Sequence, residues 1–249
     1  MGRLGGNGAI SVDGATCAAC SDATTCTALS SCSHNSGDLN GLASDGCEAV
    51  SCPTFLYADD PALAATDGYN VLTASCIMGD QFSGDGSGSR KKSIPSGKTL
   101  KIKKDPSIVG NVIMDRHQAI SSNIGRHFYV IGILLMEGIT LKGGYVSGEG
   151  GGAVQIFGTS ASGTFLSCAF IGNSADYGGA VYLAQGLATI VDTLFQNNQA
   201  SQGKAIYIYS SATSLTIVSP NPSSQTDAIG GDPSKLITTC PDISTTDLC

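Results

Sequence analysis

Charged and aromatic residues are scarce in this chain of 249 residues. Only 13% of the residues are charged, 6% are aromatic, and Trp is absent. The net charge of −7 argues against a nucleic-acid-binding protein, because phosphate recognition depends on clustered Lys and Arg. The longest apolar run, Tyr129 to Met136, is far shorter than the ~20 residues of a membrane-spanning helix. We therefore expect no nucleic-acid partner and no transmembrane segment.

Glycine and small apolar residues are abundant instead. The chain has 33 Gly, and 41% of its residues are hydrophobic. This composition is typical of a low-charge, turn-rich β protein rather than a helical or disordered one. From Ser93 onward, short segments such as Thr99 to Lys103 alternate between apolar and polar residues, which predicts strands.

Ten cysteines are present, and six of them lie between Cys17 and Cys52. This density predicts a disulfide framework and an oxidising compartment. Zinc binding is the alternative, but the chain has a single C-x-x-C, Cys17 to Cys20, and only His34 lies nearby. The cysteines predicted to form disulfides are Cys17, Cys20, Cys26, Cys32, Cys47, Cys52, Cys240 and Cys249.

The segment from Met1 to Cys17 is Gly-rich and lacks the apolar core of a secretory signal. We expect either that a presequence has been removed or that the natural start lies elsewhere. The cysteines favour a secreted protein, a cell-surface protein or one from another oxidising lumen. Composition divides the chain into a Cys-rich segment (1–79), a Gly/Ser loop (80–92), a repetitive region (93–218) and a Pro- and Ser-rich tail (219–249).

The repetitive region contains phrases that return at a fixed distance. Gly178–Leu183 returns as Gly203–Ile208, and Phe170–Ala175 returns as Phe195–Ala200, at the same spacing along the chain. A third glycine phrase, Gly151–Ile156, precedes the first at a slightly larger spacing. A period of about 25 residues without a helical pattern suits a β-solenoid, in which several short strands and turns make one coil.

In such a coil each residue lies above its repeat equivalent, about 4.8 Å away. Phe170 then stacks on Phe195 in an apolar column. Asn173 lies over Asn198, so that their amides form a ladder of hydrogen bonds along the axis. Gly178 recurs where the backbone needs a positive φ or has no room for a Cβ atom.

The paired phrases G-G-A-[ILV] and F-x-x-N resemble the repeats of the polymorphic outer membrane proteins. The segment Ile94 to Ile102 is similar to the first coil of many right-handed parallel β-helices of the pectin-lyase-like superfamily. The resemblance covers roughly residues 93–217, and Lys204 stands where its second Gly is expected. It implies an all-β chain, a right-handed parallel β-helix with three sheets and about five coils. It also implies a role in surface display and adhesion.

Parallel β-helices of this superfamily also include polysaccharide hydrolases and lyases, so a catalytic site is the alternative. Such a site needs carboxylates that converge from neighbouring coils, with basic residues nearby. Only one cluster has this character, and it consists of Asp115, Arg116, His117, Arg126 and His127. Because it contains a single carboxylate, we expect no catalytic site there.

Other reactive residues have simpler interpretations. Asp59 and Asp60 precede Pro61, where a turn and a short helix are expected. Asp80 and Asp85 lack the ligand spacing of a calcium loop, and we expect no metal or cofactor. The remaining candidate nucleophile, the thiol of Cys168, alternates with a core Phe, which predicts a buried thiol.

Two surface features remain as candidate binding sites. Alternation turns Tyr182 and Tyr207 outward in one column, with Gln155 one coil earlier, and exposed aromatic rings stack on sugars or on proteins. The alternative is that stacked tyrosines only stabilise a sheet face. The second feature is an isolated basic stripe that includes Arg90, Lys91, Lys92, Lys101 and Lys103. It either docks an anionic partner or protects the exposed end of the β-helix against edge-to-edge pairing.

These observations favour a non-catalytic structural or adhesive module that binds a partner protein or a glycan, or serves as a rigid subunit of a larger assembly. A polysaccharide lyase or glycoside hydrolase is the alternative.

Overall fold

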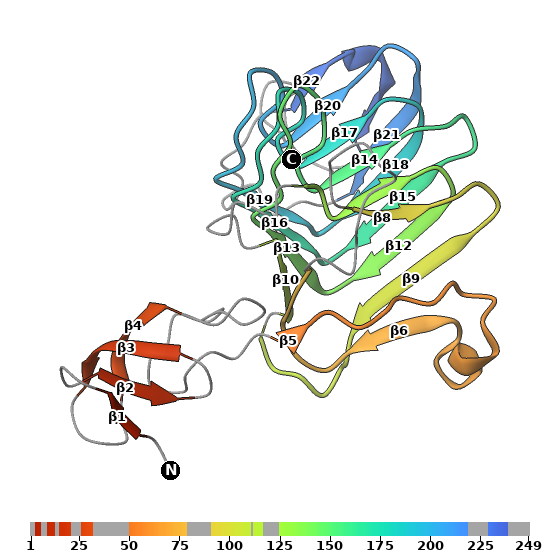
Figure 1. Cartoon of the computed structure of the whole chain (residues 1–249). Helices are drawn as coiled ribbons and strands as arrows, with labels where there is room; N and C mark the ends of the chain where they lie inside the picture. The colour runs from red at the N-terminus through yellow and green to blue at the C-terminus, as the bar shows by residue number, and fades with distance from the viewer. Residues whose placement is uncertain are drawn as a thin grey trace.

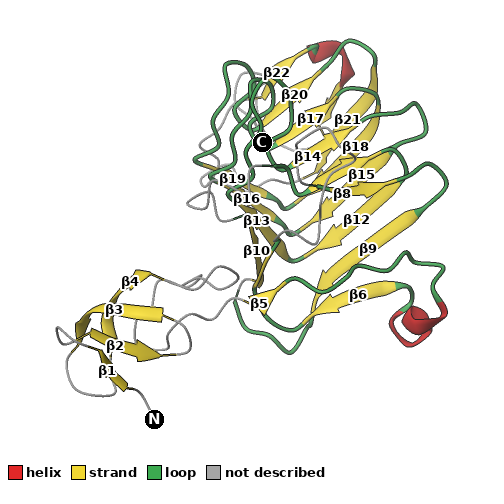
Figure 2. Cartoon of the chain, viewed as in Figure 1, coloured by secondary structure: helices red, strands yellow, loops and turns green. Residues whose placement is uncertain are grey.

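The structure is a computed structural model. It describes residues 52–78, 91–110, 112–116, 125–218 and 229–237, together with the backbone of short strands within residues 3–31, at residues 50–51 and at residue 238. Strands dominate these residues, and the helices drawn in Figure 2 are short 3-10 turns. They are η1 (Pro61–Thr66) and η4 (Pro233–Lys235).

Three parallel sheets wind around one interior (Figure 1). Sheet 1 consists, in spatial order, of β5 (Val50–Ser51), β7 (Cys76–Ile77), β10 (Val112–Asp115), β13 (Ile139–Lys142), β16 (Ala169–Ile171) and β19 (Leu194–Gln196). Sheet 2 consists of β8 (Lys92–Ile94), β11 (Phe128–Val130), β14 (Val154–Ile156), β17 (Val181–Leu183), β20 (Ile206–Ile208) and β22 (Ile229–Gly231). Sheet 3 consists of β6 (Tyr69–Leu72), β9 (Thr99–Lys104), β12 (Ile133–Glu137), β15 (Ser162–Leu166), β18 (Gly186–Val191), β21 (Ala212–Val218) and β23 (Leu236–Thr238).

Successive strands visit the sheets in a fixed order, which is sheet 3, sheet 1 and then sheet 2. The described strands from β6 to β20 form the triplets β6–β7–β8, β9–β10–β11, β12–β13–β14, β15–β16–β17 and β18–β19–β20, and each triplet is one coil. The predicted all-β parallel β-helix is therefore confirmed.

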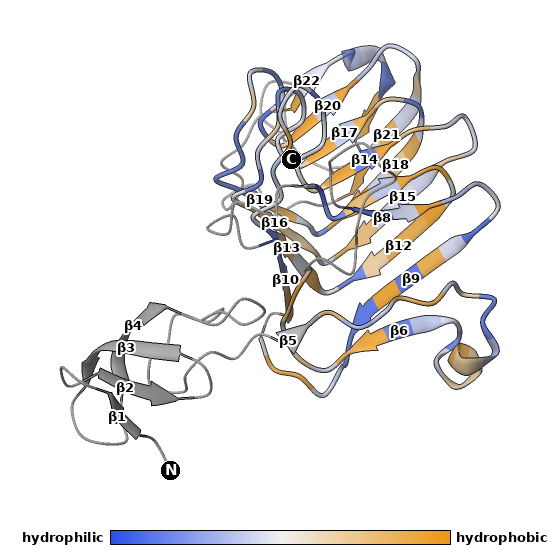
Figure 3. Cartoon of the chain, viewed as in Figure 1, coloured by the Kyte–Doolittle hydropathy of each residue, from blue (hydrophilic) through white to orange (hydrophobic). Residues whose placement is uncertain are grey.

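Apolar side chains fill the interior of the coils. The strands that carry them are largely coloured orange, as hydrophobic, in Figure 3. In each sheet, alternate residues point inward, so that Leu100 and Ile102 of β9 are fully buried. The predicted stack of Phe170 on Phe195 is present, with ring centroids 5.0 Å apart and planes inclined by 3°. The repeat spacing thus brings like residues together between adjacent strands.

The predicted asparagine ladder is also present at the turn after sheet 1. The side-chain Nδ2 of Asn173 donates to Oδ1 of Asn198 at 2.9 Å and to the carbonyl of Leu141 at 3.0 Å. Nδ2 of Asn198 donates in turn to the carbonyl of Phe170. Both asparagines are buried, so their amides supply hydrogen bonds that water does not provide.

The predicted start of the β-helix at residue 93 is wrong, because β6 pairs with β9 and β7 pairs with β10. These earlier strands carry no copy of the repeat phrases. The buried side-chain amide of Asn70 instead joins β6 to the neighbouring segments by hydrogen bonds. Asn70 accepts a hydrogen bond from the backbone N–H of Leu56 and donates to the carbonyls of Leu56 and Lys101. The predicted end at residue 218 is also too early, since β22 and β23 continue sheets 2 and 3.

The backbone near the N-terminus forms an antiparallel sheet, where the sequence indicated only a Cys-rich segment and no strands. Its strands, in order, are β1 (Arg3–Gly5), β2 (Ala9–Val12), β3 (Ala15–Cys20) and β4 (Cys26–Ser31). These strands could not be predicted from the sequence, because their residues are mostly small and show little of the apolar–polar alternation that marks a strand face.

A disulfide joins Cys52 to Cys76 across a Cα–Cα distance of 4.8 Å. We predicted Cys52 as part of the N-terminal framework, but its partner is Cys76 of β7, which was not among the cysteines predicted to form disulfides. The bond therefore closes a loop of the first coil and lies within the β-helix core. Side chains of the other cysteines predicted to form disulfides lie outside the described residues.

Candidate functional site

Four tyrosine rings gather around strands β17 and β20 of sheet 2. Tyr182 and Tyr207 are paired residues of these strands, and each is half-buried between two buried neighbours. Their ring centroids are 5.8 Å apart. Tyr177 lies 5.2 Å from the ring of Tyr207, and Tyr209 lies 6.4 Å from the ring of Tyr182. We call Tyr177, Tyr182, Tyr207 and Tyr209 the tyrosine cluster.

Two glycines next to the cluster have no room for a side chain. A Cβ atom on Gly150 would lie 2.5 Å from Cγ of Tyr182, so the ring fits only because this position has no side chain. Gly178 adopts φ +58°, and a Cβ atom there would lie 3.0 Å from the backbone nitrogen of Tyr207. Gly150 therefore admits the tyrosine ring of the neighbouring coil, whereas Gly178 is required by the backbone of the turn.

The sequence predicted two members of the cluster, Tyr182 and Tyr207, and missed the two that are most exposed. Tyr177 is 40% exposed and Tyr209 is 48% exposed. Period-two alternation already signalled Tyr209, because it is two residues after Tyr207 and faces the same side. Tyr177 gave no such signal, because it lies in the turn before a glycine phrase rather than in a strand.

The cluster is uncharged, and the charges around it are of both signs, since Arg126 pairs with Glu149 and Lys235 lies near Asp232. Burial, with the neighbouring tyrosines, raises the pKa of Tyr182, so that its phenol stays protonated at neutral pH. Glu149 precedes Gly150, and its carbonyl accepts a hydrogen bond from the N–H of Asp176. Asp232 lies one coil beyond Tyr209 in sheet 2.

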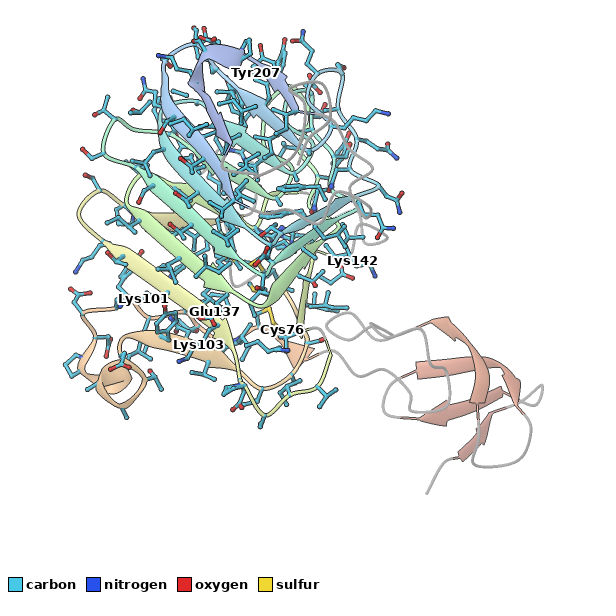
Figure 4. The ribbon with its side chains drawn as sticks, turned by 180° about the vertical axis from the view of Figure 1, so that it is seen from behind. Cys76, Lys101, Lys103, Glu137, Lys142 and Tyr207 are labelled. Atoms are coloured by element: carbon cyan, nitrogen blue, oxygen red, sulfur yellow. A yellow bond between two sulfur atoms is a disulfide. The ribbon has the colours of Figure 1, made fainter. Side chains whose placement is uncertain are left out.

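The lysines of β9 contact a tyrosine of the neighbouring strand. Nζ of Lys101 lies 5.2 Å from the ring centroid of Tyr69, and Nζ of Lys103 lies 4.7 Å from it. Nζ of Lys101 also donates to the carbonyl of Asp67 at 3.0 Å. Figure 4 places Lys101 and Lys103, with Glu137, toward one end of the β-helix and Tyr207 toward the other. The two lysines hold β6 and its turn against β9.

Other residues of the predicted basic stripe are also engaged within the chain. Lys91 is buried, with Nζ 4.9 Å from the ring centroid of Tyr129. Nζ of Lys92 donates to the carbonyl of Phe55 at 3.0 Å, and burial lowers the pKa of this lysine. Arg90 lies outside the described residues. A role in binding an anionic partner stays a prediction for these residues.

The suggestion that these lysines protect an exposed strand edge is wrong for β9. Sheet 3 continues past β9 to β6, which pairs with it in parallel register. The lysines therefore point outward from an interior strand of the sheet and do not cap its end.

The candidate catalytic cluster lies in the interior. Asp115 is 3% exposed, and Arg116, Arg126 and His127 are fully buried. The remaining member, at position 117, lies outside the described residues.

Each of the buried groups has a structural partner. Arg116 donates to the carbonyl of Met78 at 3.1 Å, and Arg126 forms an ion pair with Glu149. Nε2 of His127 lies 3.0 Å from the carbonyl of Met114. These contacts hold the turn between sheets 1 and 2.

Burial of His127 makes stability depend on pH. Burial, reinforced by the positive charge of Arg116, lowers the pKa of His127 to about 3. The unfolded chain, with a pKa near the usual ~6.5, binds the proton first, so stability is complete above that pH and falls as the pH drops toward about 3. The slope is about 1.4 kcal/mol per pH unit, or about 2 kcal/mol by pH 5.

Urea unfolding at pH 7, 6 and 5 checks this expectation. The variant His127→Gln retains a polar side chain and removes the titration, so its stability is expected to fall less steeply over this range. Carboxylates titrate equally in both proteins and cancel in the difference. Parallel curves for the two proteins would contradict the assignment.

Smaller candidates are also accounted for. Asp60 caps η1, accepting a hydrogen bond from the N–H of Ala62, and Asp59 pairs with Lys98 at 2.7 Å. The predicted core position of Cys168 is confirmed, and burial raises the pKa of its thiol to about 11, which opposes a nucleophilic role.

Among the described residues, no group of His, Cys, Asp and Glu side chains is arranged to hold a metal ion. Asp80 and Asp85 of the rejected calcium loop lie outside the described residues.

Comparisons with protein families, with curated proteins and with solved structures find no match to this chain. In the part of the chain that the structure describes, no helix is long and apolar enough to cross a membrane. The fold and its surface thus define the class of this protein as a parallel β-helix that carries a cluster of tyrosines on one sheet face.

Proposed function

We propose that this protein is a non-catalytic binding module, in which a rigid β-helix presents the tyrosine cluster to a glycan or to a partner protein. The observation that carries the proposal is the gathering of four tyrosine rings with centroids 5.2 to 6.5 Å apart along each contact. Tyrosine combines a large apolar face with a polar hydroxyl, which suits contact with sugars and with proteins.

Rigidity supports this role. Tyr182 and Tyr207 belong to strands that are hydrogen-bonded on both sides within sheet 2. Each has two buried neighbours in its strand, so the rings are fixed before any ligand arrives. A preordered surface loses little conformational entropy on binding, which favours affinity.

The expected setting is an oxidising one, at the cell surface or outside the cell. The Cys52–Cys76 bond and the density of further cysteines support this, because such bonds persist mainly in oxidising compartments. In that setting the module acts in adhesion, alone or as a rigid subunit of a larger assembly.

Ring removal tests the proposal. The double variant Tyr182→Ala/Tyr207→Ala is expected to weaken binding to the ligand found by glycan arrays and by affinity capture, about tenfold for each ring. Tyr145→Ala is the matched control, since this tyrosine is 37% exposed and lies outside the cluster. Thermal unfolding verifies that all variants fold. Equal affinity of the double variant and the parent for every captured ligand would overturn the proposal.

A further inference from the structure

We infer that the ligand of the tyrosine cluster is a single chain of an uncharged glycan, which lies across the strands of sheet 2 along the axis of the β-helix. This inference rests on the proposed function, because it identifies the ligand class of the same surface. It follows from the extent of the aromatic surface, from the tilt of its rings and from the charges around it.

The aromatic surface continues beyond the tyrosine cluster toward the first coils. Phe157 follows β14, is 43% exposed, and stacks on Tyr129 of β11 with ring centroids 6.2 Å apart. It occupies the position equivalent to Tyr209 two coils earlier, since both follow the last buried residue of their strands. From β11 to β20 the sheet advances by three interstrand spacings, about 14 Å. This length accommodates several sugar rings rather than one.

A polar residue separates the two aromatic groups. Gln155 pairs with Tyr182 in the outward column of sheet 2, between Tyr129 and the tyrosine cluster. Its side chain is half-buried, and its Oε1 atom is buried without a hydrogen-bond partner among the described atoms. Alternation of apolar rings with an amide fits a carbohydrate, which presents C–H faces and hydroxyl groups in turn.

The tilt of the rings excludes a flat ligand. The planes of Tyr182 and Tyr207 are inclined by 36°, those of Tyr177 and Tyr207 by 55°, and those of Tyr182 and Tyr209 by 66°. A crystalline polysaccharide face can contact only one of these planes at a time. A separate chain that turns from one ring to the next can contact several.

The charges around the cluster favour an uncharged chain. The carboxylates of Glu149, Asp176 and Asp232 flank it, but Glu149 pairs with Arg126, and Lys204 and Lys235 are cations on the described turns beside it. At the other end of the aromatic surface, Lys91 and Arg126 lie over the ring of Tyr129. The charges along the surface therefore come close to balancing. Hydrogen bonds from Ser234 hold the pKa of Asp232 below its usual value, so this group is ionised at neutral pH. A uronate or sulfate chain therefore meets no surface of uniform positive charge to attract it, whereas the hydroxyl groups of a neutral sugar can donate to the carboxylates.

The surface ends at β22, where the residue paired with Tyr207 is Gly230. Glycine has no side chain to extend the column, so the residue aligned with Tyr207 on the next strand does not cover its ring. Asp232 follows at the position equivalent to Tyr209 and supplies an acceptor at this end. An aromatic floor with a carboxylate at its end is an arrangement that fixes the position of a sugar.

Titration calorimetry with soluble oligosaccharides of matched length tests the inference. The probes are neutral fragments of β-glucan, mannan and xylan, acidic fragments of polygalacturonate and alginate, and crystalline cellulose as a flat surface. At least one neutral fragment is expected to bind, and Tyr207→Ala is expected to weaken it about tenfold or more. Phe157→Ala is expected to weaken long fragments but not the shortest one that binds, and Tyr145→Ala is expected to change neither.

The outcomes separate this inference from the proposed function. Tighter Tyr207-dependent binding of an acidic fragment, of crystalline cellulose or of a protein would overturn the ligand class and retain the binding module. Loss of binding in Tyr207→Ala with no effect of Phe157→Ala on any length would overturn the extended path. Failure of every probe and every captured protein to depend on Tyr207 would overturn both proposals.

Discussion

Gly178→Ala is expected to destabilise the β-helix by about 2 to 5 kcal/mol, because two costs add at this position. The backbone has φ +58°, where a residue with a side chain costs about 1 to 2 kcal/mol. A Cβ atom would also lie 2.1 Å from the carbonyl oxygen of Val181, and relief of this overlap costs about 1 to 3 kcal/mol more. Urea unfolding of the variant and the parent measures the sum.

Gly172→Ala separates the two costs. Gly172 has a similar φ of +62°, but a Cβ atom there would meet no other atom within 4 Å. This variant is expected to lose only the conformational part, about 1 to 2 kcal/mol. Equal losses in both variants would show that the turn at position 178 shifts without cost and that the overlap is unimportant.

The repetitive coils could be predicted from the sequence because like residues recur at fixed distances. The stacking of Phe170 on Phe195 follows from an offset equal to one coil, as the register of β16 and β19 shows. The first coil could not be predicted in this way. Its strands are separated from the next coil by loops of other lengths, and the pairing of Asn70 with Ile102 sets β6 against β9 at a larger offset than the repeat has.

The candidate site was predictable only where side chains alternate along a strand. Tyr182 and Tyr207 follow from that rule, because their strand neighbours are buried in the interior. Tyr177 does not follow from it, because a turn backbone has no fixed alternation and its ring direction depends on neighbouring coils. The burial of Arg116 and His127 could not be predicted either, because ionisable residues outside the strands are normally expected at the surface.

Asn173→Leu is expected to destabilise the β-helix by about 2 to 6 kcal/mol, although leucine has a similar size. Oδ1 of Asn173 accepts a hydrogen bond from the N–H of Gly144 at 2.9 Å, and Nδ2 donates to the carbonyl of Leu141 at 3.0 Å. The variant leaves both backbone groups buried without these partners, at about 1 to 3 kcal/mol each. Thermal and urea unfolding measure the loss.

Gln199→Leu is the matched control, since it makes the same change from amide to leucine on an exposed side chain of the equivalent turn one coil further on, next to Asn198. It is expected to change stability by no more than about 0.5 kcal/mol. A double variant with Asn198→Leu tests the ladder itself. Because each asparagine bonds to the other, the double variant should lose less stability than the two single variants combined. Strict additivity would show that each asparagine supports its own turn and that no coupling runs along the axis.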